Sequence, residues 1–486
     1  MRSSVFAGGA LLMLLASTAQ AATPSPLPAH APKIPERAAF RAPVPTERAT
    51  KDGLRVVLLP EHALPVVNLL LTVRAGSALD PPGKPGLAAA TARFLQEGGA
   101  GKYDAPSFLA AVDDLGGELQ VRTDESGVEI GVTVLATELD RTLALLSDLV
   151  ARPRMNAADW PATQKRQEAE ILRRQDEPRA VADGVFAHVL YGDHPYGHRP
   201  LGTATAVGQM TLADLHAFYA QHYGPRLTSV VLVGDIDPAA ATAAVDRAFS
   251  APGAKWNLHA EPAPPPAAVP PGPGRLVLVD RPGAPQSEVR VGEIGISWSS
   301  PELPAATLLE MVLGGSFTSR LNQNLREKHG YTYGARAEFK PLPAPGPFVA
   351  RAAVRTDVTA ESVHEFLREL DNIRAPLGLA EADKGRALIA QGIVEQLSDG
   401  MGAARLYGEL EEAARPLDFW SGLPAALARL TLPSVTQAAM KLIAPDKLVI
   451  VVVGDQKKIE PKLRALGLAQ KIELRDSDGN LMKTPR

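Results

Sequence analysis

The sequence predicts an α+β protein of two homologous modules, each with a mixed or antiparallel sheet and helices on one face. Two landmarks indicate the duplication. The tripeptide V-G-D ends an apolar run at Asp235 and again at Asp455, 220 residues later, and Pro65 and Pro285 precede strand-like segments at the same offset. Between these landmarks both halves are predicted to run strand, helix, helix, strand, strand, several helices and a final strand.

Proline-rich stretches divide the chain of 486 residues. The stretch 260–274 contains P-A-P-P-P and P-P-G-P-G, and such runs hold the backbone extended and leave no helix or central strand. We expect it to link an N-terminal module at 46–259 to a C-terminal module at 275–486. A second Pro-rich segment at 22–45 is predicted to be an extended N-terminal strap.

The first 21 residues have the pattern of a secretory signal peptide. Arg2 supplies the positive start, 5–16 is apolar, and the small residues Ala19 and Ala21 flank a cleavage site. The apolar run is shorter than the roughly 20 residues that span a bilayer. We therefore expect cleavage after 1–21, a soluble mature protein without a membrane span, and a periplasmic location in a Gram-negative cell.

Composition excludes several classes of function. The formal net charge is −3, which provides no basic field for nucleic acid. The chain has no cysteine, and therefore no disulfide, thiolate metal site or catalytic thiol. No H-x-x-E-H, G-x-S-x-G, P-loop or G-x-G-x-x-G motif occurs, and the ten histidines are scattered. The residues alone therefore predict no self-sufficient catalytic site.

Two helices are predicted in the first module around a possible site. The segment 86–99 has apolar residues at helical spacing and ends in two glycines. A second helix begins near Asp159, a good N-cap residue, with Pro161 in its first turn. This helix carries Glu168, Glu170 and several basic residues, which on composition form a solvated face with i, i+4 ion pairs.

The second module has a helix–helix–strand segment. A helix at 304–313 precedes two glycines, and a second helix, capped by Thr318 or Ser319, is predicted to end at Gly330. Arg326 lies in its last turn, where the helix dipole favours a cation. The strand at 331–339 alternates, which places Tyr333 on the face of 335, 337 and 339. Taken locally, Arg326 is a helix-terminal charge and Tyr333 a core aromatic residue.

Several short motifs, in order, resemble the insulinase/pitrilysin family of zinc peptidases, in the short bacterial branch that is similar to mitochondrial processing peptidase. The likeness runs from about Gly53 to Asp455. It rests on these pieces: D-G-L at 52–54, G-S at 76–77, G-L-A at 86–88, Y-G at 196–197, L-G-T at 201–203, the two V-G-D ends, and G-G-x-x-x-S-R-L, L-R-E-K and G-Y-T-Y within 314–333. The resemblance implies two α/β-roll modules that form one half of a clam shell.

The resemblance implies a degenerate zinc site in the first module. In active members H-x-x-E-H follows G-L-A at once. Ala89 and Arg93 stand at the positions of the two His ligands, and Ala92 stands at the position of the general base. The family's third ligand, a Glu 77 positions beyond the second His, matches Glu170. We therefore predict no metal in this chain and an Arg93–Glu170 ion pair in its place.

The resemblance implies that the second module keeps the family's substrate-binding pair. That pair is an Arg and a Tyr seven residues apart, and Arg326 and Tyr333 occupy both positions. The Arg would hold a substrate carbonyl and the Tyr would donate to the developing oxyanion. Donors aimed at a tetrahedral intermediate are worth about 3 kcal/mol each.

The expected function is therefore that of a non-catalytic, substrate-binding subunit of a heterodimeric zinc peptidase. A homologous partner subunit would carry the zinc, and peptides would bind extended, by addition to a sheet edge. Three alternatives stay open: a zinc endopeptidase active on its own through unrecognised ligands, a scaffold like the family's respiratory core subunits, and a homodimer that scavenges peptides.

Overall fold

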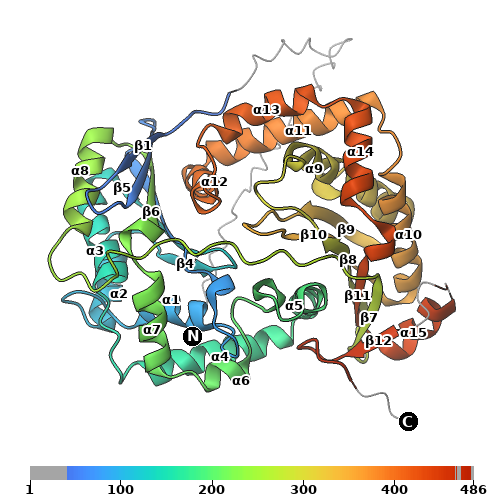
Figure 1. Ribbon diagram of the computed structural model, residues 1–486, viewed down its shortest axis with the longest axis horizontal. Helices are drawn as coiled ribbons and strands as arrows, with labels where there is room; N and C mark the ends of the chain where they lie inside the picture. Colours follow the sequence, from blue (N-terminus) through green and yellow to red (C-terminus); the bar gives the residue numbers. More distant parts are fainter. Residues whose placement is uncertain (1–40, 466, 468–471, 483–486) are drawn as a thin grey trace, which may run out of the picture. The chain divides into compact units, whose positions relative to one another are not determined.

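Two six-stranded mixed sheets organise the chain in the computed structural model, which describes residues 41–465, 467 and 472–482 (Figure 1). The predicted signal peptide and residues 22–40 of the predicted strap lie outside these residues. The first sheet has the order β1-β2-β6-β3-β5-β4, in which only β2 and β6 pair in parallel. Its strands are β1 (Thr46–Ala49), β2 (Arg55–Pro60), β3 (Val66–Val73), β4 (Gln120–Thr123), β5 (Val128–Leu135) and β6 (Thr228–Gly234).

The second sheet repeats this arrangement in the order β12-β7-β11-β8-β10-β9. Its strands are β7 (Arg275–Asp280), β8 (Gln286–Ile294), β9 (Thr332–Phe339), β10 (Pro347–Arg355), β11 (Val449–Gly454) and β12 (Ile472–Arg475). The sheets differ at one edge, where β1 pairs antiparallel with β2 but β12 pairs parallel with β7. The other five strands correspond in order and direction, which confirms the predicted fold class of two homologous modules.

Helices of the first half cover one face of the first sheet. They are α1 (Leu87–Glu97), α2 (Ala105–Asp113), α3 (Leu139–Ala151), α4 (Trp160–Gln175), α6 (Ala204–Gly208), α7 (Leu212–His222) and α8 (Pro238–Phe249). Alternate strand residues such as Leu58, Leu69 and Val230 pack with Phe94 and Leu149 in this core. Both helices predicted around the first site are present, but the Asp159 side chain makes no capping hydrogen bond.

The second half has an equivalent helical layer on its sheet. It comprises α9 (Leu303–Glu310), the π-helical segments η5 (Met311–Gly315) and η6 (Asn322–Lys328), α10 (Thr359–Asn372), α11 (Leu379–Ser398), α13 (Phe419–Arg429), α14 (Leu432–Leu442) and α15 (Gln456–Ala465). The predicted helix at 304–313 therefore ends as a π-helix. No side chain caps the start of η6, so the predicted cap by Thr318 or Ser319 does not form.

Each half contributes one helix that packs on the sheet of the other half. Helix α5 (Pro178–Tyr191), from the first half, packs Val181, Val185 and Val189 on the valines of β7 and β11. Helix α12 (Gly400–Glu412), from the second half, packs Tyr407 and Leu410 on β2, β3 and β6. Each sheet thus has a helix from the other half on the face that its own helices leave open. Residues 41–486 accordingly form one compact unit by their contacts.

The segments outside the modules are extended where they are described. Residues 261–274 contain no helix or strand, as their prolines predict. Ala42, near the end of the predicted strap, is buried in the second core, and the Tyr407 hydroxyl donates to the Pro43 carbonyl. Among the described residues, no helix has the length and apolar character needed to cross a bilayer.

Candidate functional site

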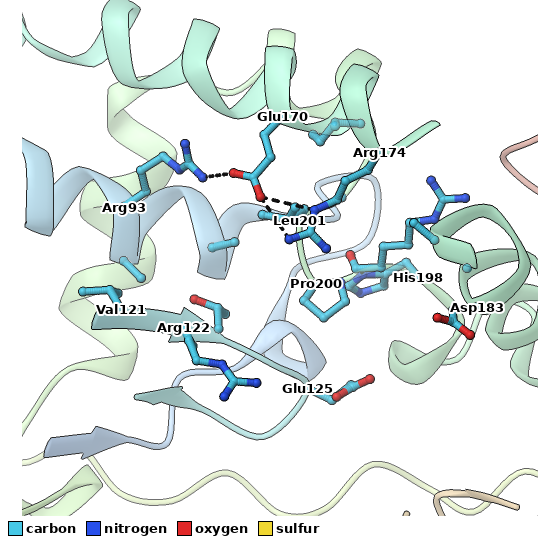
Figure 2. A pocket seen from close by; sticks show the side chains of 18 of the residues that line it. Arg93, Val121, Arg122, Glu125, Glu170, Arg174, Asp183, His198, Pro200 and Leu201 are labelled. Atoms are coloured by element: carbon cyan, nitrogen blue, oxygen red, sulfur yellow. Dashed lines mark hydrogen bonds and ion pairs between the residues drawn. The ribbon is translucent and has the colours of Figure 1, made fainter. Parts of the chain in front are cut away.

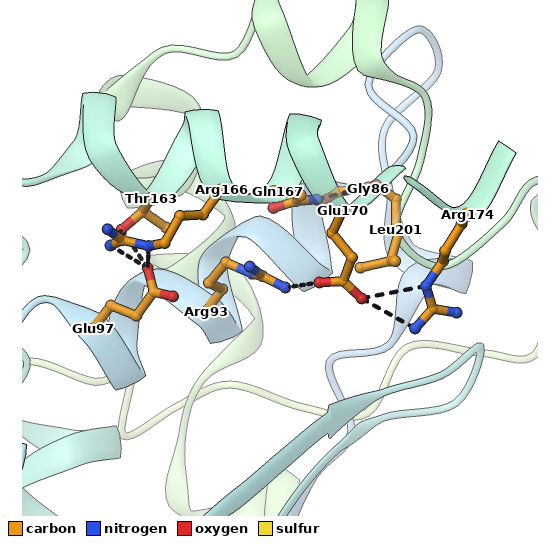
Figure 3. A network of polar contacts seen from close by, with 9 residues as sticks. All are labelled: Gly86, Arg93, Glu97, Thr163, Arg166, Gln167, Glu170, Arg174 and Leu201. Atoms are coloured by element: carbon orange, nitrogen blue, oxygen red, sulfur yellow. Dashed lines mark hydrogen bonds and ion pairs between the residues drawn. The ribbon is translucent and has the colours of Figure 1, made fainter. Parts of the chain in front are cut away.

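Two glycines fix the backbone behind the first site. Gly86 has φ +98°, and a Cβ there would lie 2.5 Å from the Leu201 carbonyl oxygen. A Cβ on Gly202 would lie 1.9 Å from the Pro85 carbonyl oxygen. From α4, buried Gln167 donates to the carbonyls of Gly86 at 3.2 Å and Leu201 at 3.1 Å (Figure 3). The G-L-A and L-G-T motifs therefore meet backbone to backbone, and α4 is held against the start of α1.

This packing brings the predicted degenerate zinc positions together. Ala89, Ala92 and Arg93 on α1 line one cavity with Glu170 on α4; its volume is about 690 Å³, and it is called the first cavity below (Figure 2). Arg93 donates to the Glu170 carboxylate, which confirms the predicted ion pair. Arg174, one turn further along α4, donates to the other carboxylate oxygen at 3.0 and 3.2 Å. Burial would raise the pKa of Glu170, but the two guanidinium groups outweigh it and hold this pKa below its usual value.

The first site does not fit zinc. A zinc centre needs at least three nitrogen, oxygen or sulfur ligands. Ala89 and Ala92 present only methyl groups, and the Arg93 guanidinium is a cation already engaged by Glu170. Nowhere in the described part of the chain do three His, Asp or Glu side chains lie close enough to hold a metal ion. An ion pair thus occupies the predicted zinc position.

Sequence reasoning missed one residue that supports this site. The Asp80 carboxylate accepts from the backbone N–H groups of Gly86 at 2.6 Å and Ala88 at 2.7 Å, at the start of α1. Burial raises the pKa of Asp80 to about 7, and it lowers the pKa of His198, whose Nε2 lies 3.9 Å from Asp80. The available signal was only an Asp between the G-S and G-L-A motifs, because Asp80 lies six residues before Gly86, the N-cap of α1, and is too far along the chain to be recognised as a cap.

The second site lies in a cavity of about 360 Å³, the second cavity, which both predicted residues line. Arg326 comes from η6 and Tyr333 from the start of β9. The Arg326 guanidinium lies over the Phe317 ring, 4.2 Å from its centroid, which is a favourable cation–π arrangement. Phe317, in the loop after η5, is itself 61% exposed, and sequence reasoning missed it.

Tyr333 faces solvent, and the reason is a β-bulge. Ala352 pairs with Ala335 and Val354 with Thr332, so that two residues of β9, Tyr333 and Gly334, lie opposite one residue of β10. A bulge turns side chains away from the regular alternation. Ala335, Ala337 and Phe339 are buried as predicted, but Tyr333 is 89% exposed. Its placement on the core face with them was therefore wrong.

Asn322 ties the helix to the strand at this site. Its side-chain N–H groups donate to the carbonyls of Ser316 at 3.0 Å and Ala335 at 2.9 Å, and its oxygen accepts from the Ala335 N–H at 2.9 Å. This buried amide thereby holds η6, which carries Arg326, against β9, which carries Tyr333. The sequence offered only a polar residue one turn before Arg326 as a signal.

One residue lines both cavities. Arg179, at the start of α5, belongs to the lining of the first cavity and of the second, because α5 belongs to the first half but packs on the sheet of the second. Its backbone carbonyl accepts from Arg290, which also lines the second cavity, so that the two candidate sites of this chain are neighbours.

Fold and site together define a two-module chain with an Arg93–Glu170 ion pair at the position predicted for the degenerate metal site. The sequence matches the family description "Insulinase (Peptidase family M16)" over residues 55–203 and "Peptidase M16 inactive domain" over residues 209–388. The chain is therefore a homologue within the insulinase, or M16, peptidase family.

Relatives and solved structures agree with this assignment. An uncharacterized zinc protease of Streptomyces coelicolor is 28% identical over 342 residues, 69% of this chain and 73% of the relative. The peptidase M16 inactive domain from Pseudomonas fluorescens has a TM-score of 0.78 at 24% identity, covering 85% of this chain and 98% of that one. A protease from Helicobacter pylori has a TM-score of 0.78 at 19% identity, covering 85% of this chain and 100% of that one. These structures share the fold.

Proposed function

We propose that this chain is the non-catalytic, substrate-binding subunit of a heterodimeric zinc peptidase, and that Arg326 and Tyr333 complete the active site of a homologous, zinc-bearing partner. One observation carries the proposal: the Tyr333 ring is 89% exposed beside Arg326, in a chain whose own metal position has an ion pair instead of ligands. An aromatic ring with that exposure adds little to a hydrophobic core.

The openness of the second cavity supports a role in a complex. Hydrogen-bond donors stabilise an oxyanion strongly only where water is excluded and the dielectric constant is low. Tyr333 stands in solvent and Arg326 is about a third exposed, at 34%. A substrate held between this surface and a partner would remove that water, and both donors would then act at full strength.

One sheet edge beside the cavities favours extended peptides. Strand β4, whose residues 121–123 line the first cavity, is the edge of the first sheet, whereas Asn322 and Glu310 already bind edge groups of β9 at Ala335 and Phe339. An edge strand offers unpaired backbone groups to which a peptide can add as a further strand. We propose that unfolded peptides or small proteins bind in this way.

The matched family and the relatives also support a role as a metal-free subunit. One matched description reads "inactive domain", and several relatives are named zinc proteases. A division of labour between a metal-bearing subunit and a metal-free one fits both observations. From the pattern of residues 1–21 we propose that the complex acts in the periplasm.

Reconstitution with a homologue that contains H-x-x-E-H, taken from the same host, tests the proposal. We expect the chain alone to leave a quenched fluorescent peptide intact and the pair to cleave it. Tyr333→Phe or Arg326→Ala should lower kcat of the pair about 100-fold or more. Tyr331→Phe and Arg355→Ala, which lie outside the second cavity, are the matched controls.

Two outcomes would favour the alternatives. Unchanged turnover with Tyr333→Phe and Arg326→Ala would indicate a scaffold. About one tightly bound zinc per purified chain, measured by mass spectrometry of the metal, would indicate a peptidase with its own metal centre.

A further inference from the structure

Five arginines and five carboxylates line the first cavity, but the ion pairs do not join them one to one. Five carboxylates line this cavity, and each has a cationic partner. The pairs are Glu97–Arg166, Glu125–Lys340, Glu170 with Arg93 and Arg174, Glu177–Arg173 and Asp183–Arg290. The negative charge of the cavity wall is therefore neutralised by the protein itself.

Three further arginines of the wall have no such partner. No carboxylate oxygen of the described residues lies within 4.0 Å of the guanidinium groups of Arg122, Arg179 or Arg199. Arg122 is opposite Glu129 in the sheet register, yet the two form no ion pair. Arg199 donates to the Ser477 carbonyl at 2.7 Å, a neutral acceptor. Glu129 acts on Arg122, and Asp478 and Asp183 act on Arg199, only from beyond 4.0 Å. These three guanidinium groups are therefore the ones on this wall that no ion pair holds.

The second cavity has an excess of positive charge in its lining, which contains Glu288 and five arginines: Arg179, Arg290, Arg326, Arg336 and Arg351. Arg290 is paired with Asp183 and Glu288, and Arg351 with Glu338. Arg336, by contrast, has no carboxylate within 4.0 Å among residues 41–465 and the described C-terminal residues. Arg179 belongs to this cavity too, so that it contributes to both.

This local excess contrasts with the chain as a whole, whose formal net charge is −3. A cleft of one sign in a molecule of the other sign concentrates ligands of complementary charge. Guanidinium groups in particular match the geometry of carboxylates, which they can bind through two parallel hydrogen bonds. The edge strand β4 beside the first cavity favours a peptide as the ligand that carries those carboxylates.

We propose that the substrates are acidic peptides, and that Arg179 receives a Glu or Asp side chain of a peptide that lies across both cavities. The proposal rests on the proposed function, because it assumes that the Arg326/Tyr333 cavity holds peptide. Arg122 and Arg199 extend the receptor into the first cavity. Arg179 acts in binding and selection, and it takes no part in the chemistry.

Binding of matched peptides to the full mature chain tests this selectivity. Three fluorescent peptides of one sequence would carry Glu, Gln or Lys at two positions, and Kd would be measured by fluorescence anisotropy. We expect the Glu peptide to bind about tenfold more tightly than the Gln peptide, and the Lys peptide least tightly. High salt should reduce the difference, since it screens charge.

Variants locate the receptor. In Arg179→Gln the Glu and Gln peptides should bind nearly equally, while Arg122→Gln should remove part of the preference. Arg247→Gln, an exposed arginine of α8 outside both cavities, should keep it. Thermal melts would confirm that each variant is folded. Equal Kd values for the Glu and Gln peptides on the unmodified chain, or a full preference that persists in both cavity variants, would overturn the proposal.

The two proposals fail in different ways. Arg326→Ala should weaken all three peptides by a similar factor and leave the Glu/Gln ratio unchanged. If the ratio collapses with Arg179→Gln but turnover of the reconstituted pair ignores Arg326 and Tyr333, the acidic-peptide site stands and the subunit role is wrong. If no peptide binds, the acidic-peptide site is wrong, and the turnover assay still decides the subunit role.

Discussion

Arg93 and Glu170 form a structural contact at the position that the resemblance to the family assigns to a metal. A lone carboxylate in a cavity wall needs a compensating cation. Arg93 supplies that cation, with Arg174 as a second donor.

Removing either partner of this pair should destabilise the chain. Both side chains are about three-quarters buried, with 23% and 21% exposure. Arg93→Ala or Glu170→Ala therefore leaves a largely buried charge with less compensation. We expect a loss of about 1–3 kcal/mol in the free energy of unfolding, between the values for surface and buried pairs. Urea denaturation of both single variants and the double variant measures it.

The control for this pair is Arg173→Ala, on the same helix, whose partner Glu177 is 51% exposed. It should change stability little. If the double variant loses as much stability as the two single variants together, the two side chains do not interact. Single variants with an unchanged Tm would likewise show that the pair contributes nothing.

At the residue scale, sequence reasoning succeeded where spacing alone decided the outcome. The family spacing placed Arg93 opposite Glu170 and brought Arg326 and Tyr333 to one cavity. It misplaced the Tyr333 ring, because period-two alternation cannot reveal the extra residue of a bulge. Arg179 went unnoticed because its position between the cavities depends on the packing of α5 on the other half.

At the scale of elements, residues of α9 and β9 line a third cavity of about 730 Å³. Glu129, Glu310, Glu409 and Glu412 line it, and burial raises the pKa of each. Glu310 connects the two elements, since its Oε2 accepts from the Phe339 N–H at 3.0 Å. The negative charges of Glu338 and Glu409 add to the effect of burial on Glu310.

This cavity predicts a pH dependence with a definite sign. Burial raises the pKa of Glu310 from 4.5 to about 7, so between these values the folded chain holds a proton that the unfolded chain releases. The contribution of Glu310 to stability is therefore greatest below pH 4.5 and declines as the pH rises to about 7. Glu310→Gln removes the decline, and relative to the unmodified chain it should gain about 1–3 kcal/mol between pH 4.5 and pH 8.

Urea denaturation of both proteins at several pH values measures this difference. Comparing the two at each pH cancels the contributions of histidines and other carboxylates. Glu118→Gln, an exposed position outside the cavity, is the control and should follow the unmodified chain. Parallel pH profiles for Glu310→Gln and the unmodified chain would contradict the assignment.

The elements themselves were largely predictable, and their ends were less so. The strand-like segment predicted after Pro65 is β3, and the helix predicted at 86–99 is α1. The caps at Asp159 and at Thr318 or Ser319 failed, because several polar residues near a helix start can compete and the tertiary packing decides between them. The π-helical turns of η5 and η6 have no simple sequence pattern.

At the scale of the molecule, the helix exchange governs stability. The continuous apolar runs of β6 and β11 are typical of strands covered on both faces, and both strands are fully buried. The sequence could therefore indicate that each sheet has two covered faces. It could not indicate that the second cover comes from the other half, because local patterns do not specify a partner.

Separated halves should therefore be unstable. A fragment of residues 41–259 would expose the face of β2, β3 and β6 that α12 covers, and a fragment of 260–482 would expose the valines under α5. We expect each fragment alone to aggregate or melt without cooperativity, and co-expressed fragments to form a stable 1:1 complex. Size-exclusion chromatography and circular dichroism check this, and cooperative melting of either isolated fragment at the Tm of the full chain would contradict it.

The exchanged helices also bear on the origin of the chain. A single ancestral copy of the module would have had one sheet face that its own helices could not cover. Two copies could have satisfied each other by reciprocal exchange of the helix, which is the geometry of a domain-swapped homodimer. The Pro-rich segment 261–274 lies between the two halves, where such copies would be joined. The two halves differ at their sites, since one has the Arg93–Glu170 ion pair and the other has Arg326 and Tyr333.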